Sequence, residues 1–333
     1  MKTLANTKLN VLDLAPIIEG HTIAESFANS LDLARHAEQL GYHRYWLAEH
    51  HNLDGIASAA TSLLIGYIAG GTSKIRVGSG GIMLPNHSPL VIAEQFGTLE
   101  TLYPNRIDLG LGRAPGSDGF TMRALRRELS GREADFGDLI TELNQYFGEP
   151  KFGQKVRAIP GQGLKIPQWI LGSSLYSAKL AAARGLPYSF AGHFAPELMM
   201  QAIDLYRVGF QPSADLKEPK VMVGVQVIAA DTDAKAKKLA TTVYQRFLGI
   251  IRNQRVNLLP PVDSMADIWT PQEEEFVLDK MRYSVFGSPE TVKVGLNKLI
   301  AETQADELII MGDAYDHHDR KRSYELIAKA ARS

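Results

Sequence analysis

Short apolar runs alternate with longer segments of helical periodicity along almost the whole chain, and this alternation constrains the fold more than any other feature. Runs typical of strands cover residues 9–15, 45–48, 75–78, 107–111, 169–171, 188–191, 221–229 and 307–311. Helical patterns lie between them, among them residues 23–40, 58–68, 89–102, 196–210 and 289–302. Strands that alternate with helices form parallel sheets with right-handed crossovers. Eight such units predict an α/β fold of the (β/α)8 type, a TIM barrel.

The chain length agrees with one barrel. The chain has 333 residues, and we expect residues 1–333 to form a single domain with insertions in the βα loops. Residues 133–167 and about 250–282 lack the alternating pattern, so we interpret them as these insertions. Pro260, Pro261 and the acidic residues 273–275 indicate an exposed segment, which could act as a mobile lid or be a passive surface loop.

Charge and composition narrow the choice of partners. Lys plus Arg number 36 and Asp plus Glu number 37, so no global field attracts nucleic acid or anionic lipid. The chain has no cysteine, which excludes disulfides and thiolate chemistry. Its most apolar stretch, residues 56–71, is shorter than the roughly 20 residues that span a bilayer. We therefore expect a cytoplasmic protein with a small-molecule substrate, and no contact with membranes or nucleic acid.

One helix predicts an assembly. Residues 58–68 are apolar or small nearly all round, whereas an outer helix of a barrel needs only one apolar face. A homodimer interface would cover the second face. The alternative is an internal contact with one of the insertions.

Active sites of such barrels form where strands end and the βα loops begin. The strand ends of this chain are polar or rich in glycine, and we expect them to converge on one mouth. The residues concerned are Glu49, His50 and His51 after the second strand, Gly80 and Gly81 after the third, Arg113 after the fourth, Gly172, Ser173 and Ser174 after the fifth, and His193 and Phe194 after the sixth.

The two adjacent histidines are the strongest candidates for proton transfer. Imidazole titrates near neutral pH, with an ordinary pKa of about 6.5. Side chains of a strand alternate between its faces, so one of His50 and His51 should point into the barrel and the other away. For the same reason we predict no metal site, because neighbouring histidines diverge and no third ligand follows at a familiar spacing.

A second group of residues suits a phosphate. Arg113 supplies a fixed charge, and Ser173, Ser174 and Ser177 place hydroxyl groups at the start of a helix. The serines could instead be simple N-caps. Residues 110–116 differ from the dinucleotide-binding fingerprint by one extra residue before the last glycine, so we set that interpretation aside. Residues 313–319 contain acidic and histidine side chains that could hold a cation, but a solvated loop is the better interpretation.

These motifs resemble those of the bacterial luciferase-like flavin monooxygenases. Residues 41–51, which end in Glu-His-His, are similar to the family's second-strand signature, and residues 80–85, 106–113, 173–187 and 287–290 match further motifs in the same order. The resemblance spans nearly the whole chain and is closest to an alkanal-monooxygenase-like branch.

The resemblance implies a chemistry and a set of roles. Reduced FMN, supplied as a co-substrate by a separate flavin reductase, would react with oxygen to a C4a-peroxyflavin that oxygenates a small organic substrate such as an aldehyde. His50 would be the catalytic base, with Glu49 and His51 beside it, and His193 and Phe194 would shape the substrate pocket. The flavin would contact Gly80, Gly81, which form a cis peptide in the family, and Arg113, Gly172, Ser173, Ser174, Tyr176 and Ser177.

Two other functions fit the same barrel. One is a deazaflavin (F420)-dependent oxidoreductase, because that branch shares the glycine-rich third strand. The other is a non-catalytic flavin-binding subunit, against which the intact Glu49, His50 and Arg113 argue. Light emission is not expected, because Gly112 stands where light-emitting members carry a cysteine.

Overall fold

A closed parallel sheet forms the centre of the computed structural model, which describes residues 2–114, 119–125, 135–254 and 256–332. Neighbouring strands pair in the order of the chain, and β10 pairs with both β8 and β1, which closes the barrel. This confirms the predicted TIM barrel. Within the described residues its eight strands are β1 (Lys8–Asp13), β2 (Arg44–Leu47), β3 (Arg76–Ser79), β5 (Ile107–Gly112), β6 (Gln168–Gly172), β7 (Tyr188–Phe190), β8 (Val221–Ala229) and β10 (Glu307–Met311).

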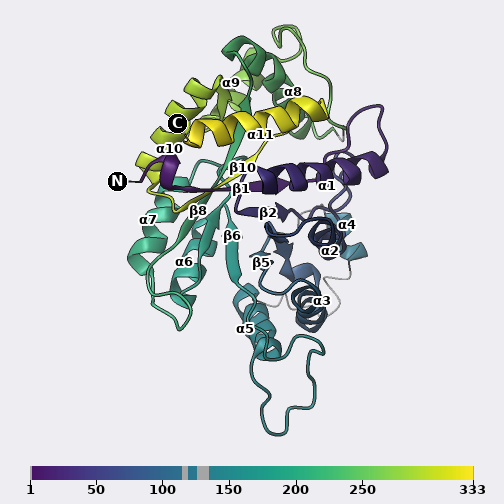
Figure 1. Cartoon of the computed structure of the whole chain (residues 1–333), viewed down its shortest axis with the longest axis vertical. Helices are drawn as coiled ribbons and strands as arrows, with labels where there is room; N and C mark the ends of the chain where they lie inside the picture. Colours follow the sequence, from purple (N-terminus) through teal and green to yellow (C-terminus); the bar gives the residue numbers. More distant parts are fainter. Residues whose placement is uncertain (1, 115–118, 126–134, 255, 333) are drawn as a thin grey trace.

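Helices surround this barrel (Figure 1). They are α1 (Ile23–Gln39), α2 (Thr61–Gly71), α3 (Pro89–Leu102), α4 (Gly119–Ala124), α5 (Phe136–Phe147), α6 (Leu175–Arg184), α7 (Met199–Gly209), α8 (Asp233–Ile251), α9 (Pro271–Lys280), α10 (Pro289–Thr303) and α11 (His317–Arg332). Two 3-10 turns, η1 (Leu4–Asn6) and η2 (Leu84–Asn86), and two short strands, β4 (Ile82–Met83) and β9 (Val285–Gly287), complete the elements of the described residues. Local signals set several boundaries: Thr22 and Glu25 form a capping box at the start of α1.

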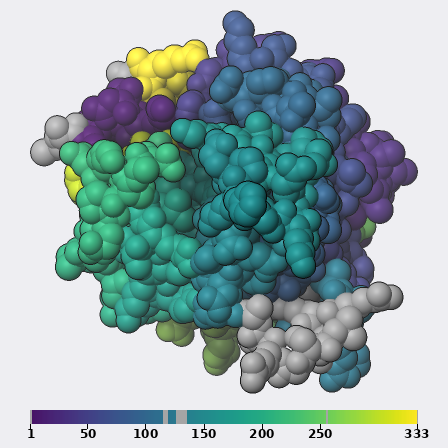
Figure 2. Space-filling model, turned by 90° about the horizontal axis from the view of Figure 1, so that it is seen from below, coloured from purple at the N-terminus to yellow at the C-terminus, as the bar shows by residue number. Residues whose placement is uncertain are grey.

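The first predicted insertion, residues 133–167, is only partly an insertion. Residues 136–147 form the barrel helix α5, which buries Ile140 and Leu143 and exposes its polar residues. A helix between β5 and β6 is what the barrel pattern requires, and the sequence interpretation missed it. The loop after α5 packs on α3, and Figure 2 shows these teal residues across the centre of one face of the molecule. Residues 133 and 134, like Pro115 and Gly116 of the glycine-rich turn, lie outside the described residues.

The second predicted insertion contains the helix α9. Thr270 and Glu273 form a capping box at its start, and Arg252 forms an ion pair with Glu273 at 2.7 Å between Nε and Oε1. Val277 and Met281 pack against α8 in a small separate core. This segment is therefore a folded helix that is attached to α8.

The amino end of the barrel interior is filled by charges and aromatic rings. Arg44 forms ion pairs with Asp108 and, at 3.0 Å between Nε and Oε2, with Glu307. The rings of Trp46 and Trp169 meet edge to face above it, with centroids 5.6 Å apart. All five side chains are buried, so this end of the barrel is closed and the remaining space lies at the carboxyl end.

Candidate active site

A cavity of about 1460 Å³ opens at the carboxyl ends of the barrel strands. Most residues predicted from the strand ends line this one cavity, although they come from five different strands. They are His50, Gly80, Gly81, Arg113, Gly172, Ser173, Ser174, Tyr176, Ser177, His193 and Phe194. Glu49 and His51 do not line it and lie beside it.

The turn after β2 separates the two adjacent histidines. The strand ends at Leu47, and Asn52 has a left-handed backbone with φ of 55°. His50 therefore lines the cavity while His51 turns toward Glu49. Strand alternation is not the reason, because both histidines follow the last strand residue; the loop conformation decides which ring faces the cavity.

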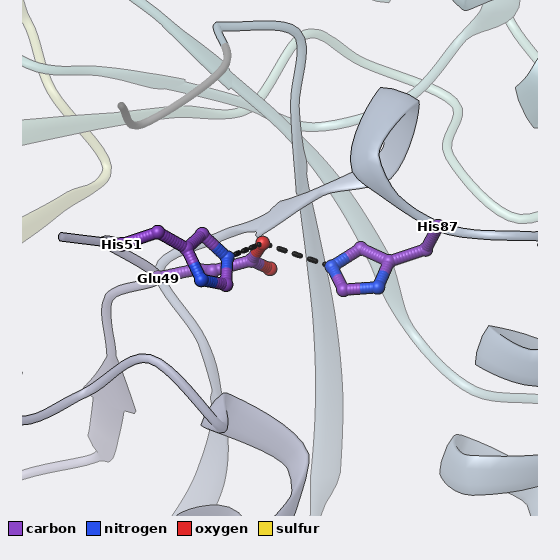
Figure 3. A group of neighbouring side chains, drawn as sticks. All are labelled: Glu49, His51 and His87. Atoms are coloured by element: carbon purple, nitrogen blue, oxygen red, sulfur yellow. Dashed lines mark hydrogen bonds and ion pairs between the residues drawn. The ribbon is translucent and has the colours of Figure 1, made fainter. Parts of the chain in front are cut away.

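Glu49 binds two histidines with one carboxylate oxygen (Figure 3). Nε2 of His51 and Nε2 of His87 each lie 2.8 Å from its Oε1, and the backbone N–H of Met83 donates to its Oε2 at 3.0 Å. Burial of Glu49 by itself raises the pKa of this carboxyl, but the hydrogen bonds from His51 and His87 prevail and lower the pKa to about 2. An ionised carboxylate only accepts, so both rings carry their proton on Nε2.

The sequence analysis missed His87. It follows η2, which comes after β3, and β2 and β3 are neighbours in the sheet, so polar residues beyond these two strand ends meet. The ligand-type atoms of Glu49, His51 and His87 lie within 4.8 Å of one another. Both oxygens of Glu49 are already engaged in hydrogen bonds, and this network accounts for the cluster.

A second cluster lies at the start of α11, where Asp316 precedes the helix and His318 and Asp319 belong to its first turn. The ligand-type atoms of Asp316, His318 and Asp319 also lie within 4.8 Å of one another, but Asp316 and His318 are exposed. Asp319 pairs with Lys235 at 2.7 Å. The predicted solvated loop is thus correct only in part, because Asp316 is exposed in the loop, whereas Asp313 is buried and paired with Arg246 and α11 begins at His317.

The glycine pair after β3 forms part of the cavity wall. The peptide bond between Gly80 and Gly81 is cis, as the family resemblance implies. A Cβ atom at Gly81 would lie 2.8 Å from the carbonyl oxygen of Gly110, and one at Gly80 would lie 2.6 Å from the side chain of Leu12. These glycines are thus required by contacts within the barrel as well as by any ligand in the cavity.

The ends of β5 and β6 bring together a basic and hydroxyl-bearing group. The guanidinium of Arg113 stacks 4.5 Å from the ring centre of Tyr176. Ser174 occupies the N-cap position of α6 but makes no side-chain capping bond, so the N-cap alternative does not account for its hydroxyl. Ser177 is buried, and its hydroxyl donates to the carbonyl of Ser174 at 2.9 Å. Arg113, Ser173 and Ser174 are therefore the better phosphate-binding candidates.

His193 and Arg246 form a third polar group on the cavity. Burial, with further contributions from Arg246 and His50, lowers the pKa of His193 to about 3. Its ring meets that of Phe194 edge to face at 5.0 Å. Arg246, on α8, forms an ion pair with the buried Asp313. The sequence analysis did not identify Arg246, because it lies on a helix rather than at a strand end.

Comparisons with known proteins agree with this architecture. A family model for luciferase-like monooxygenases matches residues 8–306. A protein of Escherichia coli (strain K12) named luciferase-like monooxygenase is 54% identical over 325 residues, which cover 98% of this chain and 96% of that protein. No helix in the described part of the chain is long and apolar enough to cross a membrane.

Two solved structures illustrate the likeness of the fold. The crystal structure of apo-MsnO8 is 36% identical, has a TM-score of 0.87 and covers 98% of both chains. The oxygenating constituent of 3,6-diketocamphane monooxygenase from Pseudomonas putida, a type II Baeyer-Villiger monooxygenase solved in complex with FMN, has a TM-score of 0.71 and 20% identity, and the match covers 98% of this chain and 97% of that one. At this identity the second likeness concerns the fold alone.

Proposed function

The chain belongs to the luciferase-like monooxygenase family, and we propose that it is a two-component monooxygenase that uses reduced FMN and oxygen to oxygenate a small organic substrate. A separate flavin reductase would supply the reduced FMN. The observation that carries the proposal is that one cavity collects a histidine, a wall of two glycines, and a guanidinium together with serine hydroxyls.

The residues of this cavity fit FMN. Arg113, Ser173 and Ser174 offer a guanidinium, hydroxyls and the N-terminus of the ten-residue helix α6 to a dianionic phosphate. Gly80 and Gly81 present a wall without side chains to a flat ring system. The FMN held by a relative in fold supports the same assignment.

Each part of the chain then has a task. Reduced flavin, when bound, supplies the activation of oxygen. The apolar side chains of the cavity exclude water, and His50 takes up or releases one proton at its cavity-facing ring. Glu49 is a positioning residue: it holds His51 and the backbone of Met83 and so fixes the loop that presents His50.

Rapid mixing of the protein and reduced FMN with oxygenated buffer tests the proposal. We expect flavin oxidation, and with it the release of hydrogen peroxide, to become slower than in free solution, because the apolar lining of the cavity shields the reacting flavin from water. Immediate oxidation with stoichiometric peroxide would contradict monooxygenation. Tight FMN binding with no effect on oxidation would favour a non-catalytic subunit, and preferential binding of reduced F420 would favour the deazaflavin-dependent oxidoreductase.

A further inference from the structure

A second polar group lines the cavity from other elements than the proposed phosphate-binding residues, and it points to the substrate. Arg246 of α8 and His193 after β7 both line the cavity, next to apolar side chains of Phe247, Ile250 and Phe276. We propose that Arg246 and His193 bind a carboxylate of the substrate, which is therefore an organic acid with an apolar body. This inference rests on the proposed function and names the class of molecule that the site accepts.

Arg246 is held in place but keeps free donors. Its Nη1 pairs with Oδ2 of Asp313, whose side chain is 1% exposed and does not line the cavity. The side chain of Arg246 is 18% exposed and does line it. Arg246 makes no other hydrogen bond to the described residues. Asp313 thus orients the guanidinium, and Nε and Nη2 remain available to a ligand.

His193 adds a neutral donor. Its Nδ1 is buried and finds no hydrogen-bond partner in the part of the chain that the structure describes. Gly224 leaves room for this atom, because a Cβ there would lie only 2.5 Å from Nδ1. With its low pKa the ring is neutral and carries one proton. A proton on Nδ1 would be a buried, unpaired N–H, which is costly, so the proton lies on Nε2.

A carboxylate is the group that matches these donors. It only accepts hydrogen bonds, and its two oxygens fit the planar fork of a guanidinium. A neutral carbonyl lacks the negative charge and the second oxygen, so it cannot form the charge-assisted bidentate contact with a guanidinium that a carboxylate forms. Because Asp313 does not line the cavity, an incoming carboxylate meets Arg246 first. The phosphate of the cofactor has its own cation in Arg113.

The apolar body of the ligand follows from the surrounding side chains. Phe247 is buried, whereas Ile250 and Phe276 are 64% and 49% exposed toward the cavity and its mouth. An apolar chain or ring that covers these two residues removes their surface from water, which is favourable. We therefore expect affinity to increase with the length of an alkyl chain attached to the carboxylate.

The test measures binding rather than turnover. Isothermal titration of the FMN-loaded protein with octanoate and with octanamide compares a charged and a neutral head group on the same chain. We expect tighter binding of octanoate, and Arg246→Met should weaken it about tenfold or more while octanamide binds as before. Arg252→Met is the matched control, because Arg252 lies at the end of the same helix, pairs with Glu273 and is not on the cavity.

Two further variants guard against a misfolded site. Arg246→Met leaves Asp313 buried without its partner, so octanoate binding is also measured in the double variant R246M/D313N. For His193, octanoate binding is compared between His193→Gln, which keeps a hydrogen-bond donor, and His193→Phe, which does not. The inference would be overturned if the wild type bound octanamide as tightly as octanoate. It would also be overturned if Arg252→Met weakened octanoate binding as much as Arg246→Met. Octanoate binding through Arg246 in a protein that does not bind FMN would contradict the proposed function and leave the carboxylate site in place.

Discussion

The two ends of the barrel differ in how their buried polar groups are used. At the amino end, Arg44, Asp108 and Glu307 pair with one another, and the rings of Trp46 and Trp169 close the space above them. At the carboxyl end, polar groups remain without protein partners among the described residues: Oδ1 of Asp313, Nδ1 of His193 and both amide atoms of Gln226. Buried polar atoms without partners are costly.

This difference separates stability from function in one barrel. The charged side chains at the amino end form ion pairs with one another, so removing one of them should lower the stability of the fold and leave ligand binding unchanged. His50 and Arg113 at the carboxyl end line the cavity, so their loss should change turnover or cofactor binding and leave stability largely unchanged. The predictions below test this division, beginning with the largest expected effect.

Removal of His50 should have the largest effect on turnover. We expect His50→Ala to lower the rate of substrate oxygenation by about 10²–10⁴-fold, the usual contribution of a general acid or base, with unchanged FMN affinity and thermal stability. Steady-state assays with a reductase, together with FMN titration, measure both quantities. The control is His43→Ala, which removes a histidine next to β2 at the amino end; normal turnover by His50→Ala would disprove the assigned role.

Removal of Arg44 should have the largest effect on stability. Arg44→Met leaves Asp108 and Glu307 with fewer partners in the barrel interior, and breaking a buried ion pair from one side costs about 3–5 kcal/mol. Urea unfolding should show this loss in the free energy of unfolding, whereas FMN affinity of the folded protein stays the same. The surface pair of Arg252 and Glu273 offers a control, since Arg252→Met should cost much less stability than Arg44→Met. Similar losses for both variants would contradict the division.

Arg113 should matter for the cofactor and little for the fold. A charge-assisted contact to phosphate is lost in Arg113→Met, and we expect FMN to bind about tenfold to a hundredfold more weakly. Riboflavin, which lacks the phosphate, should bind equally to both proteins. Arg35→Met, on the outer helix α1, serves as the control in the same fluorescence titration, and a loss of riboflavin affinity in Arg113→Met would argue against a phosphate contact.

Acid stability allows a direct comparison of the two ends. Burial by itself raises the pKa of both Glu49 and Glu307, but hydrogen bonds from His51 and His87 lower that of Glu49 to about 2, and the charges of Arg44 and Lys220 lower that of Glu307 to about 2. A folded-state pKa below the unfolded value, about 4.3 for Glu, stabilises the fold above that value, and the stabilisation is lost as the pH falls toward 2.

Replacing either glutamate by glutamine should therefore flatten the dependence of unfolding free energy on pH between about 4.3 and 2. The two variants should differ at neutral pH: Glu49→Gln should also slow turnover, because it disturbs the loop of His50, and Glu307→Gln should not. Urea unfolding at several pH values and a turnover assay at pH 7 measure the two effects. Equal turnover of both variants would remove Glu49 from the positioning role.

The smallest effect on stability is expected on the outer surface. Leu63 and Tyr67 of α2 and Leu102 of α3 are 75%, 45% and 62% exposed, in agreement with the second apolar face that led us to predict a homodimer. The double variant Leu63→Glu with Leu102→Glu should shift a dimer to monomer in sedimentation velocity, with a change in barrel stability within about 0.5 kcal/mol. A wild-type protein that sediments as a monomer would contradict the dimer.

The sequence by itself determined the barrel and placed most of the predicted site residues at one cavity. Periodicity distinguishes strands from helices, and the rule that strand ends meet at one mouth places His50, Gly80, Gly81, Arg113, Ser173 and His193 together without coordinates. The family resemblance adds the cis peptide between Gly80 and Gly81, which the structure contains. The same approach missed α5, because the segment around it was interpreted as one irregular insertion.

Only the tertiary structure decided which polar residues act together. His51 and His87 are 36 positions apart and share one oxygen of Glu49 because β2 and β3 are neighbours. Arg246 reaches the cavity from a helix and is paired with Asp313, 67 positions away. A local sequence pattern indicates which face of an element is buried, whereas the partner of a charge depends on how separate elements pack. This packing places Arg246 and His193 on the same cavity as the proposed cofactor-binding residues.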